Sequence, residues 1–146
     1  MITENNVIYY AKINQNSEII VPKTSVIGES ENILIRKEDD LTFSIYDLIE
    51  YKKILEKLKQ ASEMAISCGN IKRKKFFDEY IKELSFSGLD VIRKDSSNKV
   101  LIPNCVKDMY DIEDRVLVCN GVNHIKMFKN DDKKRAYEKR LINIFK

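Results

Sequence analysis

The sequence has no tryptophan, one histidine, two prolines, four glycines and three cysteines among its 146 residues. The cysteines, Cys68, Cys105 and Cys119, are odd in number and have no CxxC spacing, which argues against a disulfide framework. With His124 as the lone histidine, they also make a zinc site unfavourable. We therefore expect free thiols in a reducing cytoplasm, and no bound metal.

Long hydrophobic runs are also missing. The longest apolar stretches, such as residues 33–35 and 116–119, are far shorter than a membrane span. The first ten residues, "MITENNVIYY", lack the basic flank and apolar run of a signal peptide. With 43% hydrophobic and 34% charged residues, the chain is predicted to be a soluble globular protein of one domain, or of two small subdomains sharing a core.

No constellation of residues suits catalysis. His124 has no obvious partner for a Ser-His-Asp triad or a Cys-His pair. The four glycines form no phosphate-binding loop, and no carboxylate sits in an apolar run that would raise its pKa. The sequence therefore predicts a protein that is not an enzyme and needs no cofactor.

Charge is unevenly distributed between the two halves. Residues 1–70 carry 8 Lys and Arg against 11 Asp and Glu, whereas residues 71–146 carry 18 against 12. This asymmetry permits a polyanionic partner without requiring one. Two basic runs, at residues 72–75 and 133–135, are interpreted as solvated helix faces, which could also attract phosphates from a distance.

Two stretches of the chain are nearly the same. "KINQNSEIIVP" at residues 12–22 and "RKDSSNKVLIP" at residues 93–103 stand 81 positions apart. The similarity continues beyond the prolines: residues 33–35 align with residues 116–118, and Phe43, Ile45 and Tyr46 align with Ile125, Met127 and Phe128, given a one-residue difference in the intervening turn. Each copy is predicted to form two strands, a short link, two more strands and a helix.

The polar pentapeptides are predicted to be hairpin turns, because Asn, Asp and Ser tolerate tight turns and hydrogen-bond their own backbone. Pro22 and Pro103 end the strands that follow, and "RKEDDL" and "CNGVNH" form the second turn of each copy. Four short strands bury little alone. We therefore expect an α+β fold in which the two pseudo-symmetric units interlock into a small β-barrel with flanking helices.

Three helices are expected. The first begins after Asp47 as N-cap and runs to about residue 65, with Leu48, Tyr51, Leu55 and Leu58 among the residues on one stripe. The second occupies "GNIKRKKFFDEYIKELSFSG" and breaks near Gly88, and the third runs over about residues 131–145. These elements divide the chain into a first repeat (1–66), a linking helix (67–88) and a second repeat (89–146).

These residues resemble the MraZ family of tandem AbrB-like, swapped-hairpin regulators. Its members carry D-x-x-x-R, an aliphatic strand and I-P in each half, followed by a helix. Here "DSSNKVLIP" matches the second motif, "LVCNGVNHIKMF" is similar to the closing hairpin, and "LSFSG" is similar to the run that precedes the second motif. The similarity spans nearly the whole chain.

The resemblance implies a homo-oligomeric ring, cytoplasmic and nucleoid-associated, that binds repeated DNA sites in promoters. Such a protein acts as a transcriptional repressor of a division and cell-wall gene cluster. It implies DNA contacts from the second hairpin, with smaller contributions from the first copy. The expected DNA-binding residues are Lys99, Asp95, Arg93, Lys94, Asn98, Lys23 and Lys12, with Asp95 bracing the turn.

The chain departs from the family pattern at both tips. Lys99 stands where arginine is usual, so the charge is kept but the planar fork that binds guanine bidentately is lost. In the first copy Asn14 replaces the aspartate and Glu18 the arginine, which places a carboxylate where a cation is expected. The alternative is therefore a ring-forming module that has lost DNA binding and binds a protein partner, motivated by Glu18 and the acidic turn at residues 38–40.

Overall fold

The computed structural model describes residues 8–22, 25, 27, 30–86, 88–93, 98–121 and 123–144. Within these residues the chain forms eight strands and four helices. In order, they are β1 (Ile8–Lys12), β2 (Glu18–Ile20), β3 (Asn32–Lys37), β4 (Thr42–Asp47), α1 (Leu48–Ser67), α2 (Ile71–Phe86), β5 (Gly88–Arg93), β6 (Lys99–Leu101), α3 (Asn104–Met109), β7 (Arg115–Asn120), β8 (His124–Phe128) and α4 (Asp131–Ile144). The predicted α+β class is confirmed.

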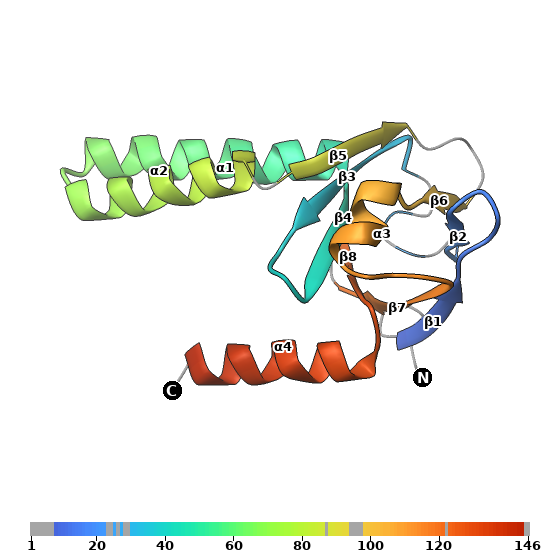
Figure 1. The fold of residues 1–146 in the computed structure, drawn as a ribbon. Helices are drawn as coiled ribbons and strands as arrows, with labels where there is room; N and C mark the ends of the chain where they lie inside the picture. Colours follow the sequence, from blue (N-terminus) through green and yellow to red (C-terminus); the bar gives the residue numbers. More distant parts are fainter. Residues whose placement is uncertain are drawn as a thin grey trace, which may run out of the picture.

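The strands from the two halves of the sequence are interleaved in space. Six of them form one antiparallel sheet in the order β1-β7-β8-β4-β3-β5, and β2 pairs with β6 in a separate two-stranded ladder. Thus β1 of the first half lies against β7 of the second, and β5 of the second lies against β3 of the first (Figure 1). Within the described residues, the six-stranded sheet ends at β1 and β5, without a pairing that would close it.

The strand registers show an approximate twofold symmetry between the two halves: when two residues pair, their counterparts in the other half pair as well. Lys12 pairs with Arg115, and the counterparts of these two residues, Arg93 and Asn32, pair with each other. On the centre strands, Phe43 pairs with Met127 while Ile45 pairs with Ile125. The offsets between counterparts are the 81 to 83 positions predicted from the repeat, including the one-residue difference before β4 and β8.

One face of the sheet packs on the main hydrophobic core. Alternate residues of the strands point to this side, among them Ile33, Phe43, Ile45 and Ile125, all fully buried. The buried Ile19 of β2 and Val100 of β6 face them from the two-stranded ladder. Since both halves supply residues to this core, neither half contains a complete one.

The opposite face of the sheet is covered near β3 and β4 by α1. Asp47 caps this helix by accepting a hydrogen bond from the Glu50 backbone N–H at 3.2 Å, as predicted. Tyr51 is buried against Leu34, Tyr46 and Leu84, with the predicted stripe residues Leu48, Leu55 and Leu58 partly buried beside it. The Tyr51 hydroxyl donates to the Leu84 carbonyl at 2.6 Å, which fastens α1 to α2.

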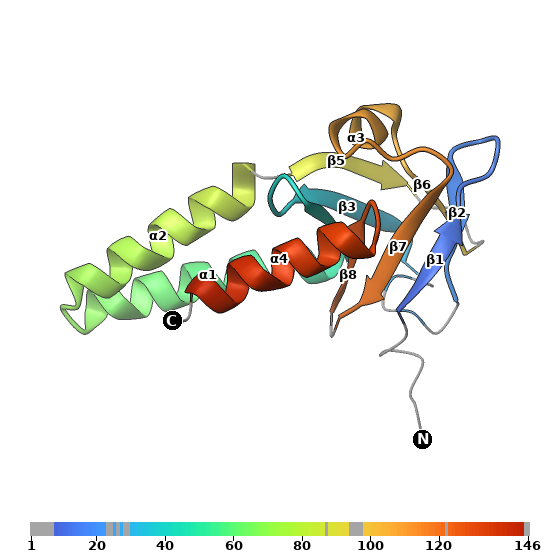
Figure 2. The same cartoon turned by 60° about the horizontal axis from the view of Figure 1, so that its bottom comes forward.

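Helices α1 and α2 form an antiparallel hairpin that projects away from the strands, and α4 extends on the same side of the molecule (Figures 1 and 2). The turn between α1 and α2 contains Gly69 at φ +73°, a left-handed conformation that favours glycine. On α4, Tyr137 packs against Phe128, and Arg140 binds Asp40 in the β3–β4 turn. The predicted start of the last helix at residue 131 is confirmed, and α2 begins at Ile71, two residues after the start of the stretch predicted for it. The predicted end of the last helix at residue 145 lies outside the described residues.

The link of the second copy contains a helix that the sequence analysis missed. Helix α3 begins after Pro103 and places Val106 and Tyr110 in the main core. The Tyr110 ring lies 5.0 Å from that of Phe43, and its hydroxyl donates to the Asp39 carbonyl at 2.9 Å. Helix α3 therefore joins the core to the β3–β4 turn.

Candidate nucleic-acid interface

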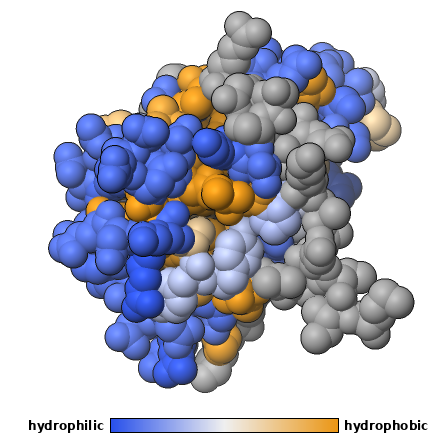
Figure 3. Space-filling model, turned by 90° about the vertical axis from the view of Figure 1, so that its right-hand side faces the viewer, coloured by the Kyte–Doolittle hydropathy of each residue, from blue (hydrophilic) through white to orange (hydrophobic). Residues whose placement is uncertain are grey.

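The β2–β6 ladder lies at the end of the molecule opposite the helical hairpin (Figure 1). The side chains of Ile19 and Val100 point inward, so the residues on either side of them point outward. Ile20 is 61% exposed and Leu101 is 40% exposed. Figure 3 views the molecule from this end and shows apolar surface next to polar residues. We call the outward face of Glu18, Ile20, Lys99 and Leu101 the ribbon face.

Asn14 organises the turn at residues 14–18, which we call the first tip. The predicted β-hairpins at residues 12–22 and 93–103 are wrong in their pairing, because β1 and β5 lie in the six-stranded sheet whereas β2 and β6 pair with each other. Asn14 accepts hydrogen bonds at its side-chain Oδ1 from the backbone N–H groups of Asn16 and Glu18, both at 2.9 Å. Its Nδ2 donates to Glu18 Oε1 at 3.3 Å. Ser17 then adopts φ +62°, as a tight turn requires. At this tip the side-chain amide of Asn14 therefore binds the carboxylate of Glu18. These two residues stand at the positions of the aspartate and the arginine in the D-x-x-x-R motif.

Replacing Asn14 by alanine should destabilise the protein by about 1 kcal/mol, because three hydrogen bonds of the turn disappear at a solvated site. Urea denaturation measures this change. Gln15→Ala is the control, since Gln15 is exposed in the same turn. A free energy of unfolding equal for the two variants would contradict the role given to Asn14.

A surface hollow of about 560 Å³ lies beside this tip. It is lined by the exposed Lys12 at the end of β1, by Glu18 and Ile20 of the ribbon face, and by turn residues that include Asn14 and Asn16. Lys12 pairs across strands with Arg115, so two cations stand at neighbouring positions on the β1–β7 edge. The hollow thus offers a cation, a carboxylate and amide groups to a ligand.

The remaining residues predicted to contact DNA belong to the second copy, apart from Lys23. Lys99 is exposed on the ribbon face, opposite Ile20. Asn98 donates from Nδ2 to the Val21 carbonyl at 2.8 Å, which fastens the ribbon to the segment after β2. Arg93 ends β5, and its side chain lies outside the described residues, as do Lys94, Asp95 and Lys23 altogether.

Lys107 of α3 is a further cation near the ribbon that the sequence analysis did not identify. Its Nζ donates to Ser17 Oγ at 2.7 Å, so it stands at the first tip although it is 90 positions away in sequence. The sequence carried little signal for it, because α3 follows Pro103 with only six residues, too few to show a hydrophobic period. Lys107 adds positive charge beside Glu18.

The acidic turn at residues 38–40 is engaged by cations of the same molecule. Asp40 binds Arg140 at 2.6 Å, and the pKa of Asp40 is lowered chiefly by this hydrogen bond. Asp39 Oδ1 accepts from the backbone N–H groups of Leu41 and Thr42. Glu38 turns inward to Arg36. The charges of the turn are therefore partly neutralised within the molecule, although the Asp40 side chain stays 71% exposed.

Glu38 belongs to a largely buried charged cluster on the helix-covered face of the sheet. It contacts Arg36 NH1 at 2.8 Å, Ser44 Oγ at 2.8 Å and Lys126 Nζ at 3.8 Å. Burial alone would raise the pKa of Glu38, but the charge of Lys126, the Ser44 hydrogen bond and Arg36 together lower it. Ser44 and Lys126 face each other at the centre of the β4–β8 pairing.

His124 lies beside this cluster. Its ring stacks on Tyr46, with centroids 4.8 Å apart, and its Nε2 is 3.3 Å from Lys126 Nζ. Burial and the nearby Lys126 charge lower the pKa of His124, which favours the neutral ring. Since Lys126 can only donate, Nε2 accepts and Nδ1 donates to Asn123 Oδ1 at 2.9 Å. These contacts assign His124 a packing role rather than a place at the ribbon.

Glu38→Ala should destabilise the protein on the order of 2 kcal/mol at neutral pH, because it removes a counter-ion from Arg36 in a nearly buried site. A carboxylate whose pKa is lowered by folding stabilises above its unfolded pKa of about 4.3, and this stabilisation is lost as pH falls through the folded value. The difference between wild type and variant should therefore shrink below about pH 4.

Chemical denaturation from pH 3 to pH 7 measures this difference. Glu63→Ala on the exposed side of α1 is the control, and its small effect should not depend on pH. A Glu38→Ala penalty that stays constant down to pH 3 would contradict the ionic role of the cluster.

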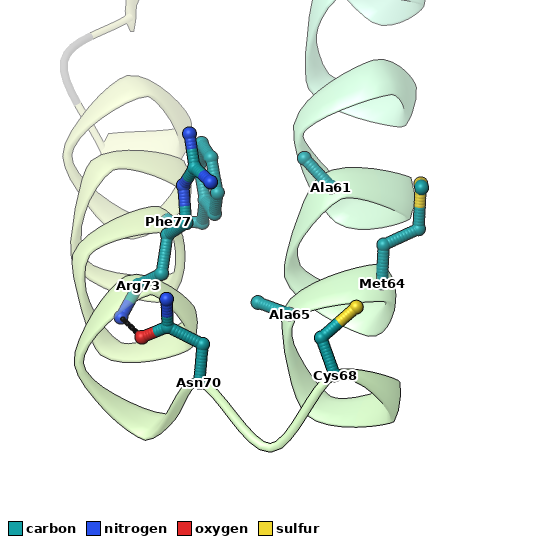
Figure 4. A pocket seen from close by; sticks show the side chains of 7 residues that line it. All are labelled: Ala61, Met64, Ala65, Cys68, Asn70, Arg73 and Phe77. Atoms are coloured by element: carbon teal, nitrogen blue, oxygen red, sulfur yellow. Dashed lines mark hydrogen bonds between the residues drawn. The ribbon is translucent and has the colours of Figure 1, made fainter.

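A second hollow, of about 270 Å³, lies between the helices near the tip of the α1–α2 hairpin (Figure 4). Ala61, Met64, Ala65 and Phe77 give it apolar walls, and Arg73 stands at its rim. The adjoining basic run contains one lysine, Lys74, that forms an ion pair with Asp78. This hollow is far from the ribbon and shares no residue with it.

No protein-family model matches the sequence, and no curated protein matches it. Among the described residues, no helix is both long enough and apolar enough to cross a lipid bilayer.

Proposed function

We propose that this protein is a DNA-binding transcriptional regulator that contacts the duplex with the β2–β6 ribbon. The observation that carries the proposal is a two-stranded antiparallel ladder at one end of the molecule with an exposed outer face. A two-stranded ribbon fits the major groove of B-DNA, which is about 12 Å wide. The basic second half of the chain supplies the electrostatic attraction.

Lys99 is the principal contact in this proposal. It is exposed on the ribbon and can donate to a phosphate or to the O6 and N7 atoms of guanine. Lys12 lies on the rim of the adjoining hollow and would bind phosphate. By the resemblance to MraZ, Arg93, Lys94, Asp95, Asn98 and Lys23 complete the contact set.

The resemblance also supports assembly into a homo-oligomeric ring, which would repress a division and cell-wall gene cluster. It further supports closure of the interlocked strands into a small barrel. A ring would multiply weak contacts, since neighbouring protomers hold each other near repeated sites at high effective concentration. The exchange of strands between the two halves is the arrangement that such swapped-hairpin proteins require.

A gel-shift titration on the DNA upstream of the protein's own gene tests the proposal. Lys99→Glu should weaken binding by about tenfold or more, because it replaces a donor with a group that repels phosphate. The slope of log K against log salt should become shallower by about one. Lys59→Glu, an exposed charge reversal on α1, is the control. Equal affinities of Lys99→Glu and wild type would overturn the proposed contact surface.

The alternative is a ring-forming module that binds a protein partner. It is favoured by the two exposed apolar side chains of the ribbon face, Ile20 and Leu101, and by the carboxylate of Glu18 beside them. Filter binding to random genomic DNA at low salt separates the two functions. Retention of DNA supports the regulator, and failure to retain any DNA supports the protein-binding module.

A further inference from the structure

Glu18 and Lys99 occupy equivalent positions on the ribbon. Glu18 pairs with Leu101, and Lys99 pairs with Ile20, so the approximate twofold symmetry carries each pair onto the other. Lys99 is displaced from Glu18 by one strand and two residues, which places their α-carbons about 8 Å apart. Both side chains project from the same outer face, so both fit within one major groove.

Among the counterpart residues of β2 and β6, only Glu18 and Lys99 differ in charge. The counterparts Ile19 and Val100 are both buried and aliphatic, and the counterparts Ile20 and Leu101 are both exposed and aliphatic. The two strands of the ribbon thus match in apolar surface, while their counterpart outward residues Glu18 and Lys99 carry opposite charges; Lys107 of α3, bound to Ser17 Oγ, stands near the Glu18 end. A duplex lying against the ribbon meets a donor at one end and an acceptor at the other.

The Glu18 carboxylate is held ready to accept. Its Oε1 receives the Asn14 Nδ2 hydrogen bond, and among the described residues Oε2 has no hydrogen-bond partner. The backbone N–H of Glu18 donates to Asn14 Oδ1 at 2.9 Å, which restrains the backbone from which the side chain projects. A carboxylate in a groove is repelled by phosphates, but it can accept a hydrogen bond from N4 of cytosine.

We propose that the Glu18 and Lys99 ends of the ribbon recognise different bases, so that each protomer binds a non-palindromic site in one fixed orientation. Lys99 donates to guanine O6 or N7, and Glu18 accepts from cytosine N4. A symmetric protein reads a palindrome, because its two contact ends are identical. Here the contact ends differ, and the site must differ with them. This inference rests on the proposed DNA-binding function.

Selection from random-sequence duplex DNA supplies the preferred site of the wild-type protein. Three duplexes are then compared by titration: the selected site, a palindrome built from its Lys99 half, and a palindrome built from its Glu18 half. Wild type should bind the selected site about tenfold or more tightly than either palindrome. Glu18→Lys should instead prefer the palindrome of the Lys99 half by a similar factor.

The exchanged variant, Glu18→Lys with Lys99→Glu, provides a matched test with unchanged net charge. It should retain the preference for the selected site, while ethylation interference shows its phosphate contacts moved to the opposite end of that site. Circular dichroism and urea denaturation establish that each variant is folded.

The possible failures are distinguishable. If wild type binds no DNA, the proposed function fails. If wild type binds DNA but selects a palindrome, or if the exchanged variant keeps the wild-type interference pattern, then DNA binding stands and the orientation inference is overturned. If Glu18→Lys still prefers the non-palindromic site, Glu18 does not determine the asymmetry and the inference is likewise overturned.

Discussion

Residues 1–70, produced without the rest of the chain, are expected to have no folded monomeric state. In the intact protein β1 pairs with β7, β2 with β6, β3 with β5, and β4 with β8. Removing the second half therefore takes away these strand partners, and the fragment keeps the β3–β4 hairpin, the packing of α1 on it and a small contact between β1 and β2. A lone hairpin with one helix has too little core to be stable.

Circular dichroism and sedimentation of the fragment at several concentrations measure this effect. Mixing it with residues 71–146 should restore sheet structure and cooperative unfolding, because the break falls in the exposed turn near Gly69 and disrupts no strand. Cooperative unfolding of a monomer of residues 1–70, independent of concentration, would contradict the interlocked core.

Phe43→Ala is expected to destabilise the full-length protein by about 4 kcal/mol. Phe43 is fully buried near the start of β4, packs on the Tyr110 ring and pairs with Met127. Its removal leaves a cavity where α3 and both halves of the sheet meet, and such a cavity collapses only in part. Urea denaturation followed by circular dichroism measures the loss.

Phe76→Ala is the matched control for this substitution. Phe76 is 64% exposed on α2, so the same change of side chain should cost no more than about 0.5 kcal/mol beyond its contacts with Phe77 and Tyr80. A similar cost for the two variants would mean that Phe43 is not at the centre of the core.

The correspondence between the two repeats was the part of the fold most accessible from the sequence, whereas the pairing of strands across the halves was not predicted. The repeated pattern at residues 12–22 and 93–103 gave the offset between β2 and β6, and the aliphatic runs gave that between β3 and β7. Side-chain alternation fixes which residues face the core, so an alignment of two repeats also aligns their buried faces. The preference for aspartate at a helix N-cap placed Asp47 at the start of α1.

Contacts between distant residues were not accessible in the same way. The cluster of Arg36, Glu38, Ser44 and Lys126 is assembled by the β4–β8 pairing, and nothing in the local pattern of "RKEDDL" distinguishes an inward Glu38 from an outward one. Helix α3 has only six residues, too few for a hydrophobic period to be visible. At the ribbon, the sequence identified Glu18 and Lys99 but not Lys107, whose position depends on α3.

The α1–α2 hairpin joins the two repeats into one chain, so their sequences can change independently. A dimer of two identical units suffers every substitution twice, once in each unit, so its two contact ends must change together. Here both units belong to one polypeptide, joined through the turn at Gly69. A mutation at codon 18 leaves codon 99 untouched, and one end of the ribbon is thereby free to acquire a new preference while the other retains its own.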